Sequence, residues 1–223
     1  MKEGDFVLIE FVGRVAGTGE IFDLTDEETA KKEGIYSQDQ KYEPVLVVIG
    51  AKMAISGIEK ALLEMNPGDE KEFSVKPEDA FGFRNPKLIK IISKANFMRQ
   101  KIDPAPGIFV TIDGMRARVQ SVSGGRVRID FNHPLAGKEL QYRLKVSKQV
   151  EGAKEKSDAL LHHYGLKCET ALEEGNLKIK SKKLPDGLKK MFADEIKKRV
   201  GGIKEVRFEE IPEKNGDKPK ANA

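Results

Sequence analysis

Few side chains of this 223-residue sequence offer the chemistry of a metal site or of a covalent mechanism. The single cysteine, Cys168, excludes an internal disulfide and a cysteine zinc site. Two of the three histidines, His162 and His163, are adjacent, so on a helix they would point about 100° apart and could not bind one metal ion together. We therefore expect neither a metal site nor a cofactor.

One carboxylate has an unusual setting. Asp23 follows Ile21 and Phe22 and precedes Leu24, so it lies inside an apolar stretch that begins a predicted strand. A carboxylate in such a place is costly unless it is paired. Asp23 is therefore the first candidate for a functional polar group.

The elements around Asp23 predict a small sheet. Alternating residues predict a strand over 5–16 with two apolar faces, and the further predicted strands cover 21–23, 45–49, 70–75 and 139–150. A short helix is expected over 27–33. Ser56 and Glu59 fit a capping box that would begin a second helix, in which the serine caps and the glutamate reaches back. This order predicts an α+β fold, in which an antiparallel sheet wraps on one helix.

Several stretches then match a family, in the right order and at plausible spacing. Residues 47–50, 55–62, 65–69 and 77–82 resemble the FKBP-type peptidyl-prolyl cis–trans isomerases. Residues 132–137, Asn-His-Pro-Leu-Ala-Gly, resemble the SlyD branch and its archaeal relatives, where this motif marks the return from an insert-in-flap domain. The resemblance covers residues 1–150, and the C-terminal part resembles an extension of the long archaeal form.

The resemblance implies three domains. An FKBP-like domain would comprise residues 1–83 and 132–150, and a β-rich insert-in-flap chaperone domain would comprise 84–131. A small α/β domain would follow over 151–223. Rotation about an X–Pro bond needs no nucleophile: an apolar pocket that desolvates and twists the imide, with a placed N–H donor, lowers its barrier.

The site residues are likewise implied by the resemblance. Asp23 would be the polar group of the pocket, and the Ile55 backbone N–H would donate to a substrate carbonyl. Phe81 matches a tyrosine whose hydroxyl usually bonds the substrate, and Tyr142 matches a phenylalanine on the last strand. The other implied pocket residues are Phe11, Phe22, Val45, Val47, Ala54 and Ile58.

Two positions depart from the family pattern. Phe81 lacks the hydroxyl, and Ile58 stands where many members have a tryptophan floor. We expect a wider, less polar pocket with weaker binding of macrolide inhibitors and modest turnover. A holdase chaperone with a vestigial prolyl pocket is the alternative.

The insert is predicted to hold strands over 88–93, 109–112, 119–122 and 127–131 and a short helix within 93–100. The resemblance implies that it captures unfolded, proline-containing client chains. We expect exposed client-binding side chains at Ile92, Phe97, Met98 and Met115. The predicted core of the insert comprises Ile91, Ile108, Val110, Val119, Val127 and Ile129.

Charge divides the chain sharply. Residues 1–83 carry 9 basic and 18 acidic residues, whereas residues 84–131 carry 10 and 3. Alternation should place Arg116, Arg118, Arg126 and Arg128 on one sheet face, which suits a solvated face, attraction to acidic clients or to the acidic first domain, or RNA binding. Because no aromatic stacking platform is interleaved with them, nucleic acid is the weaker interpretation.

The C-terminal part is predicted to contain helices over 153–164 and around 188–200, strands over 177–181 and 203–211, and a disordered tail over 212–223. A two-stranded sheet is marginal alone, so we expect a homodimer through residues 151–211. No apolar run of membrane-spanning length is present, and no secretory signal is recognisable. A cytoplasmic protein that does not enter membranes is expected.

Overall fold

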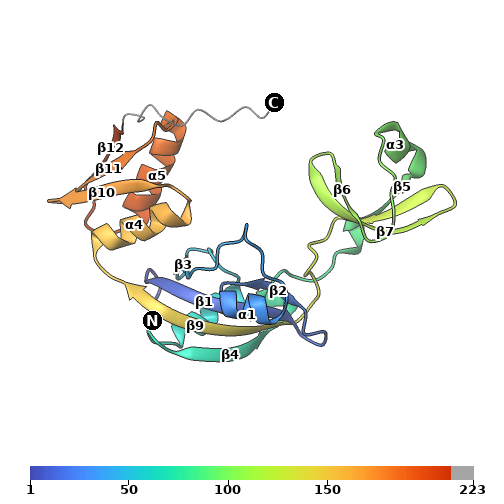
Figure 1. The fold of residues 1–223 in the computed structure, drawn as a ribbon, viewed down its shortest axis with the longest axis horizontal. Helices are drawn as coiled ribbons and strands as arrows, with labels where there is room; N and C mark the ends of the chain where they lie inside the picture. The colour runs from blue at the N-terminus through green and yellow to red at the C-terminus, as the bar shows by residue number, and fades with distance from the viewer. Residues whose placement is uncertain (212–223) are drawn as a thin grey trace.

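The computed structural model describes residues 1–211, and the predicted disordered tail at 212–223 lies outside the described residues (Figure 1). The first sheet has the strand order β2-β1-β9-β4, and β3 also pairs with β1. Its strands are β1 (Phe6–Val15), β2 (Ile21–Leu24), β3 (Val45–Val48), β4 (Glu70–Val75) and β9 (Leu140–Val150). All of its strand pairs are antiparallel. The predicted α+β fold is confirmed.

Both faces of β1 are covered, which explains why both are apolar. On one face, Val7 and Ile9 pack in the cluster that contains the helix α2 (Ser56–Leu63). On the other face, Phe6 packs with Leu160 and Ile196 of the C-terminal part. At the far end of that same face, the helix α1 (Glu27–Lys32) covers Val12 through its residue Ala30.

The predicted capping box of α2 is wrong. The N-cap is Ile55, which makes no side-chain cap hydrogen bond. Ser56 instead donates its hydroxyl hydrogen bond to the carboxylate of Asp79 at 2.9 Å. One Glu59 carboxylate oxygen is buried without a partner in the described part of the chain. The capping box does not form because the Ser56 hydroxyl bonds to Asp79 in the 77–82 loop instead.

The insert forms a separate four-stranded sheet in the order β5-β8-β7-β6. Its elements are η2 (Pro86–Leu88), β5 (Ile89–Ser93), α3 (Lys94–Arg99), β6 (Phe109–Ile112), β7 (Met115–Ser123) and β8 (Arg126–Asp130). Val110, Val119, Val127 and Ile129 form the core as predicted. The core assignments of Ile91 and Ile108 are wrong: Ile91 is 65% exposed, because it lies on the sheet face opposite Val127 and Ile129, and Ile108 is 38% exposed beside β6.

The C-terminal part contains one more strand than the sequence predicted. Its elements are α4 (Ala153–His163), β10 (Cys168–Glu173), β11 (Asn176–Ser181), α5 (Asp186–Arg199) and β12 (Glu205–Glu210). The sheet order is β10-β11-β12, with an antiparallel and a parallel pair. Because its core is continuous with Phe6 and Val48 of the first sheet, this part is stabilised within the chain.

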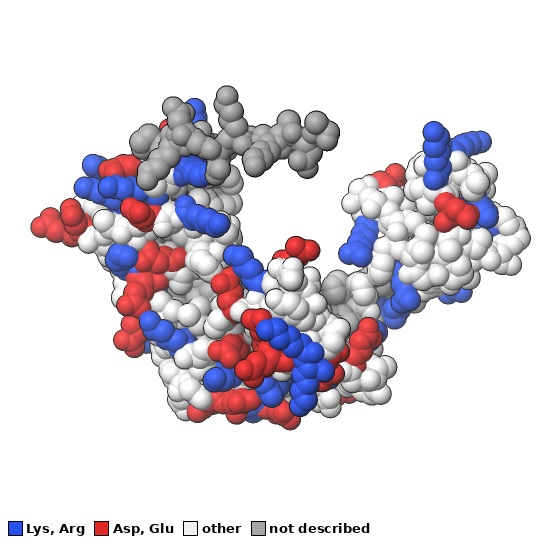
Figure 2. All heavy atoms as spheres, in the orientation of Figure 1, with Lys and Arg blue, Asp and Glu red and all other residues white. Residues whose placement is uncertain are grey.

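The three sheets occupy separate places along the molecule (Figure 1). The insert and the C-terminal part both rise from the same side of the first sheet, with open space between them in Figures 1 and 2. Among the described residues, no helix is long and apolar enough to cross a membrane.

Candidate prolyl-binding site

A row of residues crosses the first sheet and defines the candidate site. Asp23 on β2 lies opposite Gly13 on β1, Gly13 lies opposite Tyr142 on β9, and Tyr142 lies opposite Phe73 on β4. Residues that are paired in register share one face of a sheet. The polar candidate and the aromatic side chains are therefore brought to the same face.

Tyr142 is the centre of an aromatic cluster. Its ring lies 6.0 Å from Phe11, 5.7 Å from Phe22 and 6.0 Å from Phe73 between centroids, with Phe22 edge-on and Phe73 stacked. Gly13 makes the approach possible, because a Cβ atom there would lie 2.6 Å from the Phe22 ring and 3.1 Å from the Tyr142 ring. The cluster supplies the apolar surface that a proline ring needs.

Asp23 and Tyr142 influence each other electrostatically. Burial raises the pKa of Tyr142 to about 12, and the nearby charge of Asp23 adds to the rise. The hydroxyl is therefore protonated at neutral pH. Partial desolvation raises the pKa of Asp23 above 3.8, while a hydrogen bond from the Leu24 amide offsets part of that effect. The Asp23 side chain keeps contact with water at the rim of the cluster.

The residues predicted to form the floor of the pocket, and the predicted N–H donor of Ile55, lie beside the aromatic cluster around Tyr142. Val47 and Ile58 are buried in the core that includes Tyr142, whereas Val45, Ala54 and Ile55 are half-buried against it. Within residues 1–211, the Ile55 N–H takes part in no hydrogen bond. It is thus available to a ligand, and Val47 and Ile58 can act only as the bottom of the site.

Phe81 lies in a loop that is tied to α2 and to the chain returning from the insert. The Asp79 carboxylate accepts from Ser56 and, at 2.6 Å, from Lys60 Nζ, and the Lys60 bond is the main reason that the pKa of Asp79 is lowered. The Phe81 ring stacks on His133, 4.1 Å between centroids and 5° from parallel. Phe81 is half-buried against the core cluster, so it forms one wall of the site.

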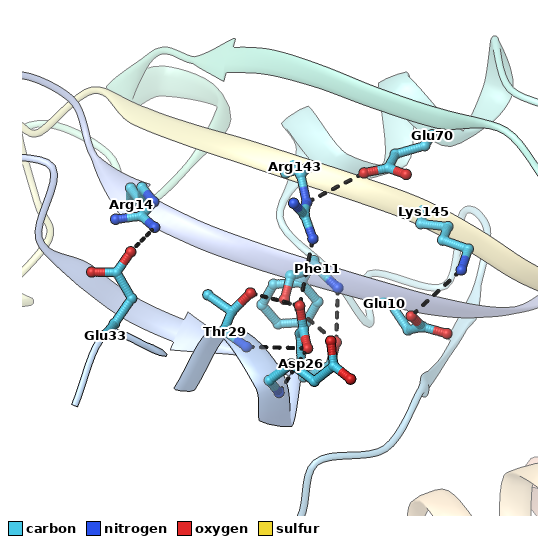
Figure 3. Close-up of polar contacts among 11 residues, drawn as sticks. Glu10, Phe11, Arg14, Asp26, Thr29, Glu33, Glu70, Arg143 and Lys145 are labelled. Carbon is cyan, nitrogen blue, oxygen red and sulfur yellow. Dashed lines mark hydrogen bonds and ion pairs between the residues drawn. The ribbon is translucent and has the colours of Figure 1, made fainter. Parts of the chain in front are cut away.

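Just beyond Asp23, the junction between β2 and α1 is tied to the sheet, and Figure 3 shows Phe11, Asp26, Thr29 and Arg143 at this junction. Thr25 accepts from the Phe11 amide at 2.8 Å and returns its own amide to the Phe11 carbonyl at 3.0 Å. Asp26 caps α1 by accepting from the Thr29 amide and also lies 3.5 Å from Arg143 of β9. These contacts hold the end of β2 against the sheet and leave Asp23 on the aromatic face.

A hollow on this domain lies on the opposite face of the sheet. It has a volume of about 510 Å³ and runs beside α1, with Arg14, Glu33 and Arg143 among its lining residues. Of its lining residues, Arg14 pairs with Glu33, and Arg143 pairs with Asp26 and Glu70 outside the hollow, as Figure 3 shows. The α1 segment bounds this hollow on one side, and β1, β4 and β9 bound it on the other.

Three residues of the site were missed from the sequence. Gly13, Phe73 and His133 owe their roles to strand register and to a contact across the insert. For Phe73, the alternation of β4 was an available signal, because Phe73 and Val75 point to the covered face. The local sequence around Gly13 gives no sign of its contact with Tyr142. The sequence around His133 likewise gives no sign of its contact with Phe81.

The predicted client-binding residues of the insert divide into two groups. Met98 and Met115 are 55% and 52% exposed, as expected. Phe97 is 3% exposed because it turns into the core between Val110 and Val127, so the prediction of an exposed Phe97 is wrong. Ile92 is half-buried against the same core. In the described part of the chain, no group of three or more His, Cys, Asp or Glu side chains could hold a metal ion.

Comparison with known proteins identifies the family. Residues 1–98 match the family described as FKBP-type peptidyl-prolyl cis-trans isomerase, and residues 90–135 match the one described as FKBP26, IF domain.

Similar proteins from three organisms carry the same family name. The short-type peptidyl-prolyl cis-trans isomerase of Methanocaldococcus jannaschii is 36% identical over 146 residues, 66% of this chain and 92% of that protein. SlyD of Helicobacter pylori is 29% identical over 164 residues, 72% of this chain and 81% of that protein. The FKBP-type 16 kDa peptidyl-prolyl cis-trans isomerase of Escherichia coli is 31% identical over 151 residues, 66% and 91% of the two chains. This chain belongs to the FKBP-type peptidyl-prolyl cis–trans isomerases.

Proposed function

We propose that the face formed by Asp23, Tyr142 and the surrounding aromatic rings binds X–Pro segments of unfolded or partly folded proteins and accelerates their cis–trans isomerisation. The observation that carries this proposal is the row from Asp23 through Gly13 and Tyr142 to Phe73. It places one carboxylate beside a cluster of aromatic rings. No nucleophile or metal is needed, because no covalent bond is made or broken in the reaction.

The mechanism acts on the resonance of the imide. A planar imide carries partial negative charge on its carbonyl oxygen, and a twisted imide carries less of it. Removing water with the Phe11, Phe22 and Tyr142 rings therefore disfavours the planar form, and a nearby Asp23 carboxylate disfavours it further by repulsion. The free Ile55 N–H holds the substrate through another carbonyl. Desolvation and repulsion thus favour the twisted state over the planar ground state, whereas the Ile55 contact positions the substrate.

The test is isomerisation of a proline tetrapeptide that is too short to need the insert. Asp23→Ala should lower kcat roughly tenfold or more, because the repulsion that disfavours the planar imide is lost. Glu20→Ala is the matched control: it removes an exposed carboxylate three residues away, outside the aromatic face, and should leave the rate unchanged. Equal rates for wild type and Asp23→Ala would overturn the assignment of Asp23.

We further propose that the insert captures client chains before they reach this site. Its exposed Met98 and Met115 support this role, because methionine is flexible and polarizable and adapts to varied partners. A client that is held by the insert is presented to the prolyl site at high effective concentration.

Two remaining proposals concern the state of the whole chain. A cytoplasmic location is supported by the unpaired Cys168.

A homodimer through residues 151–211 is supported by exposed apolar side chains on α5, namely Leu188 and Met191. The marginal stability of a two-stranded sheet no longer supports it, because the sheet of this part has three strands. Light scattering on the eluted protein decides this point: a strict monomer would contradict the dimer.

A further inference from the structure

One face of the insert sheet carries four arginines with no covering element. Arg116 and Arg118 on β7 and Arg126 and Arg128 on β8 are all exposed. Their cross-strand partners on the same face include Phe109, opposite Arg118, and Ile91, opposite Arg128. We call these six residues the arginine face. The other face of the sheet is the one that packs against Phe97 of α3.

The four arginines of the arginine face form no ion pair within the described chain, and Asp130, which lies opposite Arg118, pairs with Arg84 instead. The ion pairs of the insert join Arg84 to Asp130 and Lys94 to Asp103. Across residues 1–211, no carboxylate lies within ion-pair distance of Arg116, Arg118, Arg126 or Arg128 (for comparison, ion pairs are formed all along the first domain). Figure 2 shows this contrast: the insert is mostly blue and white, whereas red and blue side chains intermix over the first domain.

Apolar groups lie among these charges. Ile91 is 65% exposed and Phe109 is 43% exposed, and the Arg116 guanidinium lies 4.2 Å from the centre of the Phe109 ring. Exposed apolar side chains between unpaired arginines suit a ligand that carries both carboxylates and apolar groups. Arginine is well matched to carboxylates, because its planar fork can bind both oxygens at once.

The aromatic rings of the insert argue against RNA as this ligand. Sequence-tolerant binding of single strands relies on free aromatic faces on which bases stack. Phe97 is buried, the Phe109 ring is capped by Arg116, and Lys90 lies over the Phe131 ring at 5.5 Å.

The geometry points to a defined client class: the arginine face binds polypeptide segments in which acidic residues are interspersed with apolar ones. This inference deepens the proposed chaperone role of the insert and rests on it. It predicts that this chain selects clients by charge as well as by apolarity, through a surface on the face of the sheet opposite α3.

The test measures fluorescence anisotropy of labelled, proline-free peptides with the full chain. The first peptide alternates Asp and Glu with Leu and Phe. In its two matched forms, the acidic residues are replaced by Asn and Gln in one and by Lys in the other. The fourth probe is a single-stranded RNA of similar length. Arg126→Ser/Arg128→Ser is compared with Lys87→Ser/Arg99→Ser, which removes the same charge from exposed positions of the insert outside the arginine face.

The acidic peptide should bind most tightly and should weaken with added salt. Arg126→Ser/Arg128→Ser should reduce its affinity roughly five- to tenfold, since two exposed charge contacts are lost, whereas the lysine–arginine control should bind like wild type. Equal binding of the three peptides, equal loss in the two variants, or RNA binding tighter than that of the acidic peptide would each overturn the inference.

The proposed enzymatic function is read separately, on the same wild-type sample, from isomerisation of a proline tetrapeptide without acidic residues. Selective binding of the acidic peptide without tetrapeptide isomerisation would support the arginine face and overturn the prolyl assignment. Isomerisation with no preference for the acidic peptide would do the reverse.

Discussion

At the scale of single residues, the ionised Asp23 carboxylate lowers the stability of the fold. Its pKa is raised mainly by desolvation, so folding disfavours its ionised form. The carboxylate therefore subtracts from stability at neutral pH, and this penalty disappears as the pH falls through the raised pKa toward 3.8, the value of the unfolded chain. Any catalytic contribution of the carboxylate is lost over the same range.

Asp23→Asn should accordingly be more stable than wild type at about pH 7, by less than about 1 kcal/mol, because the side chain keeps contact with water. The difference should shrink as the pH falls below the raised pKa. Urea unfolding of both proteins at several pH values measures it. A variant that is less stable than wild type at neutral pH would show that the carboxylate is a net stabilising group.

The Phe81 ring carries no hydroxyl, so it offers no hydrogen bond to a ligand of the proposed site. Because its ring stacks flat on His133, Phe81→Tyr should keep that packing and add a hydroxyl at the ring edge. One added hydrogen bond would raise the affinity for a macrolide inhibitor roughly three- to tenfold. Calorimetric titration of both proteins tests this, with His133→Ala as a probe of the stacking; unchanged affinity for Phe81→Tyr would place the ring edge outside the pocket.

Most of these residues could be predicted from the sequence, but their arrangement in space could not. Asp23 was noticeable because an acid among Ile21, Phe22 and Leu24 is unusual. Gly13 was not, because its importance is the absence of a side chain beneath Phe22 and Tyr142. Such a requirement exists only after strands far apart in the sequence have been aligned in register.

At the scale of elements, the insert shows why exposure is hard to predict. Phe97 and Met98 are neighbours on α3, yet one is buried and the other is 55% exposed. Which side of a six-residue helix faces the sheet is decided by the sheet itself. The same holds for β5, where Ile92 faces the core and Ile91 faces solvent on the arginine face.

This division gives opposite consequences for two adjacent substitutions. Phe97→Ala should destabilise the insert by about 3–5 kcal/mol, because it empties the core. Met98→Ala should change stability by no more than about 0.5 kcal/mol but weaken suppression of client aggregation. Hydrogen exchange of the insert amides and a light-scattering aggregation assay separate the two effects. A destabilised Met98→Ala variant would contradict the assignment of Met98 to the client surface.

Longer elements were predictable where one pattern dominated. The strands 5–16 and 139–150 were recovered as β1 and β9, because β1 is mainly apolar on both faces and β9 alternates between apolar and polar residues. The strand β10 was missed, since its inward-facing residues, Cys168, Thr170 and Leu172, are only half-buried and include a polar threonine. The cap of α2 was misassigned because a distant loop competes for Ser56.

At the scale of the whole molecule, the charge boundary in the sequence coincides with a structural neck. Asn85 and Asn132 bond reciprocally there, with the Asn85 amide 2.8 Å from the Asn132 side-chain oxygen and the Asn132 side-chain nitrogen 3.1 Å from the Asn85 carbonyl. Arg84 bonds Asp130 beside them. The chain thus leaves and re-enters the first domain at nearly one point, so the insert can be replaced by a short glycine linker.

We propose that this one chain isomerises X–Pro bonds at the Asp23 face and is supplied with clients by the insert. Refolding of a protein limited by a slow trans-to-cis prolyl step tests both parts at once. Wild type is compared with Asp23→Ala and with a variant in which a glycine linker replaces residues 84–131. Wild type should accelerate the slow phase and both variants should lose much of that effect, while the linker variant alone should keep its rate on a short tetrapeptide. If wild type suppresses aggregation but leaves the slow phase unchanged, the site is not catalytic and the protein is a holdase.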